Sequence, residues 1–182
     1  MAEDLRTALR EDPAARNRLE VALLYPGVHA VWAHRLAHFW WGHGAKLPAR
    51  ALSQLARAMT GVEIHPGAVL GRRLFIDHGM GVVIGETARV GEDVTIFHGA
   101  TLGGTSMAKG RRHPTVGDRV MVGAGAKVLG PITVGSDAKV GANAVVVKDV
   151  ADGAVAVGVP AKMKGKIRAV DVEPHVDPAI YI

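Results

Sequence analysis

Aliphatic side chains recur every six residues from residue 62 onward. Fourteen positions follow this period in three registers: Ile64, Leu70, Ile76 and Val82; Ile84, Val90, Ile96 and Leu102; and Val116, Val122, Val128, Val134, Val140 and Val146. Glycine directly follows eight of them, as expected where a short, flat strand must bend sharply. Hexapeptide repeats of this kind predict a mainly β protein, a parallel β-helix whose stacked rungs bury one aliphatic column.

One stretch interrupts the repeat. Residues 103–115, GGTSMAKGRRHPT, have no aliphatic side chain in register and are rich in glycine and basic residues. We expect them to project from the coil as a loop, and a polar excursion from a regular scaffold is a common place for function. The β-helix domain is predicted over residues 62–168, followed by a flexible tail at 169–182 with three acids, two prolines and no repeat.

Residues 1–61 have apolar positions three and four apart, which is typical of amphipathic helices. Asp12, which precedes a proline, is predicted to be the N-cap of a helix with that proline at its first position. Breaks are expected at residues 25–27 and 42–44, and a further helix at 48–60. The helix between the two breaks is predicted to align on one side Val28, Val31, Trp32, Leu36 and Phe39. These segments form an N-terminal helical subdomain.

The composition narrows the classes of protein. The chain has no cysteine, which excludes disulfides and a cysteine nucleophile and fits a cytoplasmic location. Its acidic start is unlike a signal peptide, and no run of about 18 apolar residues predicts a membrane span. The pI of about 9.8 comes from scattered lysines and arginines with few aromatic residues, so a small anionic ligand is favoured over nucleic acid.

His78 is the best candidate for a general base. It lies in FIDHGMGVVIGET, beside Asp77 and fifteen residues after Glu63, so with about eighteen residues per coil Glu63 and His78 could meet on adjacent rungs. Transfer of an acyl group to an alcohol needs such a base, a group that orients it, and donors for the developing oxyanion. Taken alone, His78 would more often be an ordinary surface or core histidine.

Four motifs, taken together, favour a general base at position 78 over an ordinary histidine. EIHPGA, IDHGMGVVIGET, HGATLGGT and GRRHPTVGDRVMVGAGAKVLG, in this order and spacing, closely resemble the serine acetyltransferase family from about Asp12 to Pro160. The resemblance implies a left-handed coil with three repeats per turn. It also implies transfer of acetyl from acetyl-CoA, a cosubstrate, to the hydroxyl of L-serine, without metal or a permanently bound cofactor. The product, O-acetyl-L-serine, leads to cysteine.

The resemblance also assigns roles to particular residues. His78 would be the base and Glu63 the acid paired with it, one methylene longer than the family's usual aspartate. Asp12 and Asp77 would hold the amino group of serine. Arg112 and His113 would hold its carboxylate and help to stabilise the tetrahedral intermediate. Acetyl-CoA would lie between neighbouring β-helices along Gly104, Ala124 and Gly125, with its phosphates near lysines drawn from Lys127, Lys139, Lys162 and Lys164.

The implied partners are further copies of the chain and one other enzyme. A homotrimer with active sites between subunits is expected, while a hexamer stays open. L-cysteine is the expected feedback inhibitor. Ile182 and its carboxylate are expected to dock in O-acetylserine sulfhydrylase, unless the tail packs on its own trimer.

Three alternatives remain at this point. The acceptor could be another small alcohol, such as a sugar or homoserine, or the coil could be a non-catalytic scaffold. Histidines 65, 78, 98 and 113 also invite comparison with zinc-binding β-helix carbonic anhydrases. Such an enzyme would not need the segment around Asp12 or the GRRHP loop, so zinc is disfavoured. His34 and His38, spaced as helical metal ligands can be, lack the glutamate of an HExxH motif.

Overall fold

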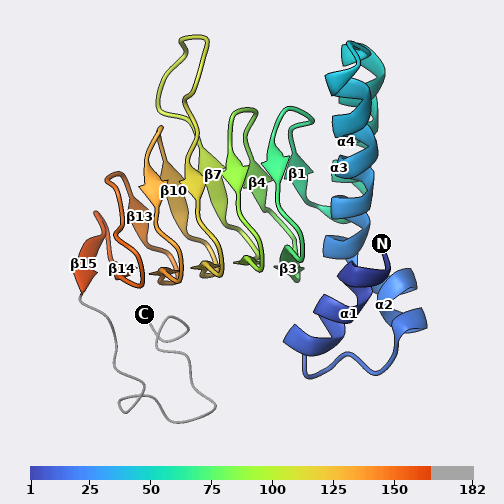
Figure 1. Ribbon diagram of the computed structural model, residues 1–182, viewed down its shortest axis with the longest axis horizontal. Helices are drawn as coiled ribbons and strands as arrows, with labels where there is room; N and C mark the ends of the chain where they lie inside the picture. The colour runs from blue at the N-terminus through green and yellow to red at the C-terminus, as the bar shows by residue number, and fades with distance from the viewer. Residues whose placement is uncertain (165–182) are drawn as a thin grey trace.

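The computed structural model describes residues 1–164, in which four helices stand at one end of a β-helix (Figure 1). The helices are α1 (Ala2–Glu11), α2 (Arg18–Leu24), α3 (Pro26–Gly42) and α4 (Lys46–Thr60). The strands are β1 (Glu63–Ile64), β2 (Val69–Leu70), β3 (Phe75–Asp77), β4 (Val83–Ile84), β5 (Arg89–Val90), β6 (Thr95–Phe97), β7 (Thr101–Gly103), β8 (Thr115–Val116), β9 (Met121–Val122), β10 (Lys127–Leu129), β11 (Thr133–Val134), β12 (Lys139–Val140), β13 (Val145–Val146), β14 (Val155–Val157) and β15 (Lys162–Lys164). No helix in this part of the chain is long and apolar enough to cross a membrane.

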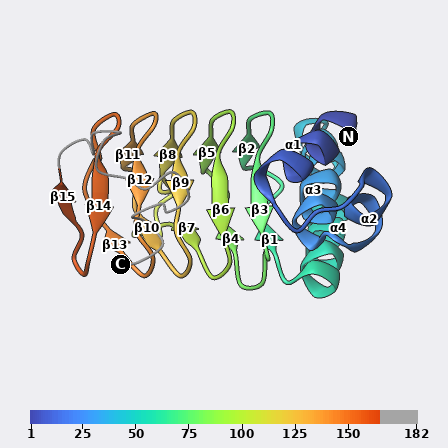
Figure 2. The same ribbon diagram turned by 90° about the horizontal axis from the view of Figure 1, so that it is seen from below.

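Three sheets form the sides of the β-helix, and Figure 2 shows their strands stacked away from the helices. The β1 face contains β1, β4, β7, β10 and β13; the β2 face contains β2, β5, β8 and β11; the β3 face contains β3, β6, β9, β12, β14 and β15. All pairings are parallel except that of β14 with β15. The predicted parallel β-helix is confirmed, and its left-handed sense stays a prediction.

The aliphatic column predicted from the sequence is the core of this coil. Thirteen of the fourteen positions are buried, and Leu70 packs against them at the edge. The register assigned to Val82 is wrong, because Ile64 pairs with Ile84 across the rungs. Val82 instead precedes β4 as Val62 precedes β1, in a second buried column of smaller side chains.

In the first three turns, the rungs exceed eighteen residues at two places. Val83 pairs with Thr101, eighteen residues later, whereas Glu63 pairs with Val83, twenty residues later. Thr101 pairs with Lys127, twenty-six residues later. The two extra residues fall in the corner between β3 and β4, and the eight extra residues form the projecting loop between β7 and β8 (Figure 1). Both departures from the period contain candidate functional residues.

The helical subdomain begins differently from the prediction. Asp12 is not an N-cap but follows the last residue of α1, and its Oδ1 accepts a hydrogen bond from the backbone N–H of Ala14 at 2.8 Å. Asn17 caps α2 instead, because its side chain accepts from the N–H of Glu20 at 2.9 Å. Both side chains satisfy local backbone donors, and only that of Asn17 does so at the start of a helix.

Helix α3 packs on the β-helix through small side chains. Its buried positions are Gly27, Val28, Ala30, Val31, His34 and Ala37. A Cβ at Gly27 would lie 2.2 Å from the carbonyl oxygen of Ile76, so only glycine allows this approach to β3. The aligned apolar residues are buried only at the start of the helix, since Leu36 and Phe39 are 46% and 58% exposed.

Helix α1 is held at its first turn by ion pairs. The carboxylate of Glu3 lies 2.9 Å from Arg72 and 3.1 Å from Arg73, both just before β3. The buried carboxylate of Asp4 lies 2.6 Å from Arg35 and accepts a hydrogen bond from Trp32 Nε1 at 2.9 Å. These contacts fix the first turn of α1 relative to the β-helix and α3.

Candidate active site

His78 lies in the expanded corner between β3 and β4. Its backbone has a φ of 58°, and Gly79 and Gly81 also have positive φ, which turns the chain sharply within a few residues. The imidazole is 71% exposed, with Nε2 3.6 Å from Asp77 Oδ2. The ring of His98, on the next rung, approaches edge to face with centroids 5.7 Å apart. The corner thus presents an accessible imidazole next to a carboxylate.

An apolar hollow of about 170 Å³ adjoins this imidazole. Its walls are His78, Phe97, His98, Met121, Gly123, Ala124 and Ala142. Ala124, a predicted contact of acetyl-CoA, therefore lies beside the candidate base. Gly125 follows it at the same corner, where a Cβ on Gly99 would lie 3.4 Å from the Gly125 Cα. The small side chains let a thin ligand approach the backbone here.

Asp12 and Asp77 lie around one tyrosine, Tyr25. The Tyr25 hydroxyl donates a hydrogen bond to Asp12 Oδ2 at 2.5 Å. Burial raises the pKa of Tyr25 to about 12, with further contributions from Asp12, Glu20 and Asp77. The two aspartates predicted to hold an ammonium group thus both act on Tyr25, and Asp77 also lies beside His78. We call His78, Asp77, Asp12 and Tyr25 the His78 edge.

Glu63 lies on β1, one rung before the corner that holds His78. Within residues 1–164 its ion pair is with Arg57, whose Nε lies 3.3 Å from Glu63 Oε2, and the carboxylate in contact with His78 is that of Asp77. A pairing of Glu63 with His78 would require Glu63 to exchange the guanidinium for the imidazole.

His113 is buried at a second corner, where the projecting loop returns to the coil. The Thr87 hydroxyl accepts from the backbone N–H groups of Arg112 at 3.0 Å and His113 at 3.1 Å. The same hydroxyl lies 2.9 Å from His113 Nδ1, which also accepts from the N–H of Thr87 at 3.2 Å. Because Nδ1 is an acceptor, the ring proton of the neutral imidazole is on Nε2.

The charged side chains at this corner, Arg112 and Glu86, pair with each other. Arg112 donates a short hydrogen bond from Nη2 to Glu86 Oε2, which lowers the pKa of the Glu86 carboxyl. Burial and the charge of Arg112 lower the pKa of His113. A Cβ at Gly85 would lie 2.0 Å from the His113 ring, so this glycine makes room for it. We call Arg112, His113, Glu86 and Thr87 the Arg112 edge.

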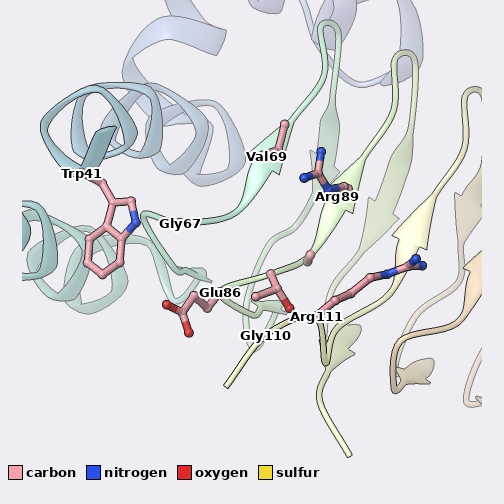
Figure 3. A pocket seen from close by; sticks show the side chains of 9 residues that line it. Trp41, Gly67, Val69, Glu86, Arg89, Gly110 and Arg111 are labelled. Carbon is pink, nitrogen blue, oxygen red and sulfur yellow. The ribbon is translucent and has the colours of Figure 1, made fainter. Parts of the chain in front are cut away.

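A cleft of about 370 Å³ opens on the outer side of the Arg112 edge, between the helical subdomain and the loop (Figure 3). Trp41 forms one end, Arg89 and Arg111 lie across from it, and Glu86 forms part of the wall. Gly104, another predicted contact of acetyl-CoA, belongs to this corner, since a Cβ there would lie 3.3 Å from His113 Nε2.

One chain does not bring the two edges together. The corner of His78 precedes β4, and Gly85, against which His113 packs, directly follows β4, so this strand lies between them. In residues 1–164, no group of three His, Asp or Glu side chains is placed to hold a metal ion.

Sequence reasoning missed four residues that shape the two edges. Tyr25 was interpreted only as part of a helix break, although it bonds Asp12. Gly85, Glu86 and Thr87 form the GET segment of a motif already quoted, but their contacts with the loop depend on pairing across rungs. The spacing of Thr87 and His113, twenty-six residues, equals that of the enlarged rung and could have indicated the contact.

Comparison with known proteins agrees with this architecture. The family described as bacterial transferase hexapeptide (six repeats) matches residues 113–148. A serine acetyltransferase of Mycobacterium tuberculosis is 64% identical over 166 residues, which cover 91% of this chain and 72% of that protein. A serine acetyltransferase of Helicobacter pylori is 62% identical over 168 residues, covering 92% and 98%.

Solved structures give the same result. The serine acetyltransferase of Neisseria gonorrhoeae in complex with serine has a TM-score of 0.87 at 44% identity, and the match covers 90% of this chain and 67% of that one. That of Brucella abortus in complex with coenzyme A has a TM-score of 0.88 at 42% identity, covering 91% and 66%. A serine acetyltransferase in complex with cysteine has a TM-score of 0.90 at 41% identity, covering 92% and 65%. The chain spans about two thirds of the length of these solved proteins.

A β-helix of hexapeptide repeats with an accessible imidazole beside an apolar hollow defines an acyltransferase of the hexapeptide class. Relatives at this identity and coverage narrow the class further. The chain belongs to the serine acetyltransferase family.

Proposed function

We propose that the chain transfers the acetyl group of acetyl-CoA to the hydroxyl of L-serine, giving O-acetyl-L-serine and coenzyme A. The observation that carries this proposal is the position of His78, beside Asp77 and an apolar hollow. The imidazole removes the hydroxyl proton as the serine oxygen attacks the thioester carbonyl. The tetrahedral intermediate collapses with loss of the thiolate, which receives that proton from the imidazolium. Glu63 would stabilise the imidazolium after giving up Arg57.

The two edges match the two charges of an amino acid. Asp12 and Asp77 suit an ammonium group, and Arg112 presents a planar guanidinium that suits a carboxylate. His113, held neutral with its proton on Nε2, can donate a hydrogen bond to the carboxylate or to the oxyanion. Glu86 and Thr87 hold Arg112 and His113 in place before any substrate arrives.

A complete site needs residues from two copies of the chain, because β4 separates the edges within one copy. A trimer, in which the His78 edge of each subunit faces the Arg112 edge of the next, provides three such sites. Acetyl-CoA would then lie in the groove between subunits, along Ala124 and Gly125 on one side and Gly104 on the other. Inhibition by L-cysteine at the serine site is consistent with the solved relative that contains cysteine.

Two further predictions rest on the sequence. The docking of Ile182 in O-acetylserine sulfhydrylase concerns a residue outside the described range 1–164. The cytoplasmic location rests on the absence of cysteine.

The test is release of free coenzyme A thiol from acetyl-CoA with one acceptor at a time. L-serine should support turnover far above L-homoserine, glucose or no acceptor, and mass spectrometry should identify O-acetyl-L-serine. Equal turnover with homoserine or glucose would indicate another acceptor. No turnover with any acceptor would favour a scaffold without catalysis.

A further inference from the structure

We propose that Tyr25 is a positioning residue that sets the orientation of Asp12 for the ammonium group of the acceptor. The proposal rests on the proposed function, in which Asp12 and Asp77 bind that group. Tyr25 itself need not contact the substrate. Its phenol contacts the carboxylate that does, and its own place is fixed by the packing of α3 on the β-helix.

The backbone of Tyr25 is fixed on both sides. It follows the last residue of α2 and directly precedes the first of α3, Pro26, so its φ and ψ of −93° and 104° belong to a tight link between two helices. Two residues later Gly27 packs against the carbonyl of Ile76, the residue before Asp77. The phenol is therefore held at a constant place relative to Asp77.

The carboxylate of Asp12 has one defined donor on each oxygen. Oδ1 accepts from the N–H of Ala14 at 2.8 Å and Oδ2 accepts from the Tyr25 hydroxyl at 2.5 Å. A carboxylate has about four acceptor sites, so both oxygens can still accept from an ammonium group. The two hydrogen bonds fix the plane of the carboxylate and leave its free lone pairs for the ligand.

The loss of the hydroxyl should matter because two like charges share this site. Asp12 and Asp77 both act on Tyr25, and without the hydrogen bond from the phenol the Asp12 carboxylate is free to turn away from its present orientation. A charged hydrogen bond of this kind contributes enough for roughly a tenfold to hundredfold effect on affinity. The effect should fall on the amino group of the acceptor, not on the acyl donor.

The experiment compares Tyr25→Phe with the wild type in steady-state kinetics. KM for L-serine should rise roughly tenfold or more, while kcat stays within about threefold and KM for acetyl-CoA is unchanged. 3-Hydroxypropionate, which is serine without its amino group, is measured as a competitive inhibitor against L-serine. Its inhibition constant should be the same for both proteins, since it has no ammonium group for Asp12 to bind.

Trp32→Phe is the matched control. It also removes an aromatic donor to an aspartate of the helical subdomain, Trp32 Nε1 to Asp4, but that pair belongs to the anchor of α1 and not to the His78 edge. KM for L-serine should change less than twofold to threefold in this variant. An equal rise in both variants would indicate general loosening of the subdomain and would overturn the proposal.

Two other results would also overturn it. An unchanged KM for L-serine in Tyr25→Phe would show that Asp12 needs no help from the phenol. An equal loss of affinity for 3-hydroxypropionate would show that the effect does not act through the amino group. If the wild type does not acetylate L-serine at all, the proposed function fails first, and this failure is visible before any variant is made.

Discussion

The His78 edge and the Arg112 edge lie at opposite ends of the same strand, yet they differ in how far their polar groups are satisfied within one chain. His78 is 71% exposed and its nearest acid is 3.6 Å away. His113 is 8% exposed, and Thr87 bonds both its ring and its backbone. The imidazole of the base is open, whereas the groups of the Arg112 edge are already organised.

The difference follows from what each edge would do. A base must exchange a proton, so its ring has to be accessible and cannot be held in one protonation state by strong partners. A group that recognises a carboxylate or an oxyanion works best when it is fixed in advance, because no reorganisation is then needed during the reaction. The base lies in the corner with two extra residues, and the anion-binding residues lie in the loop with eight extra residues.

Removal of the base should have the largest effect. His78→Ala should lower kcat by roughly 10²- to 10⁴-fold, the usual contribution of a positioned general base. The exposed side chain makes few contacts, so the thermal midpoint should stay within a few degrees of the wild type. His98→Ala, which removes the neighbouring ring of the same hollow, is the control and should lower kcat less than tenfold. A His78→Ala variant that keeps half of the activity would exclude His78 as the base.

A mixture of two inactive variants should then test whether the edges of different copies combine. His78→Ala and Arg112→Ala, each inactive alone, are denatured and refolded together in equal amounts. Random assembly gives a wild-type His78 edge facing a wild-type Arg112 edge in about one quarter of the sites, so about a quarter of the activity should return. Separately refolded variants mixed without denaturation are the control. If the co-refolded mixture stays inactive, the edges do not form a shared site.

A substitution at Gly85 should disturb the Arg112 edge alone and have a smaller effect. Gly85→Ala places a methyl group 2.0 Å from the present position of the His113 ring, which must move. We expect a loss in kcat/KM for L-serine of roughly tenfold, since a misplaced donor stabilises the oxyanion poorly. Gly42→Ala, where no atom lies within 4 Å of the added carbon, is the matched control and should change activity less than twofold. Full activity in Gly85→Ala would mean that His113 is not needed where it lies.

The coil could be predicted from the sequence because its period is local and repeated. Twelve buried aliphatic positions follow directly from the spacing of six. Val82 was assigned wrongly because the two residues added near His78 shift the register without breaking the apolar pattern. The exposure of Leu36 and Phe39 could not be predicted from the spacing, because it depends on which residues of α3 approach the β-helix.

The site was less predictable because its contacts cross rungs and subdomains. The prediction that Asp12 is an N-cap is wrong because Asn17 caps α2, while Asp12 accepts a hydrogen bond from Tyr25. No regular spacing in the sequence connects Tyr25, between α2 and α3, with Asp12 at the end of α1. The separation of the two edges also depends on which corner follows which strand, and the repeat alone does not determine this.

The joint between α3 and the β-helix contains a buried histidine that should make stability depend on pH. His34 Nε2 lies 3.2 Å from the carbonyl oxygen of Ala68, while Nδ1 is buried without a partner among the described residues. Burial lowers the pKa of His34 to about 4, with smaller contributions from His38, Arg35 and His65. The ring is therefore neutral in the folded protein, whereas in the unfolded chain it takes up a proton near pH 6.5.

The smallest effect that we predict follows from this difference. Above about pH 6.5 neither state binds the proton and the contribution of His34 to stability is complete. As the pH falls from 6.5 toward 4, only the unfolded chain is protonated, so the free energy of unfolding decreases, by about 2 kcal/mol between pH 6.5 and 5. His34→Gln keeps a donor for Ala68 and cannot titrate, so between pH 7 and 5 it should lose about 2 kcal/mol less than the wild type. Urea unfolding at both pH values measures this, with His43→Gln at the exposed end of α3 as control. Parallel losses in the wild type and His34→Gln would show that the titrating group is elsewhere.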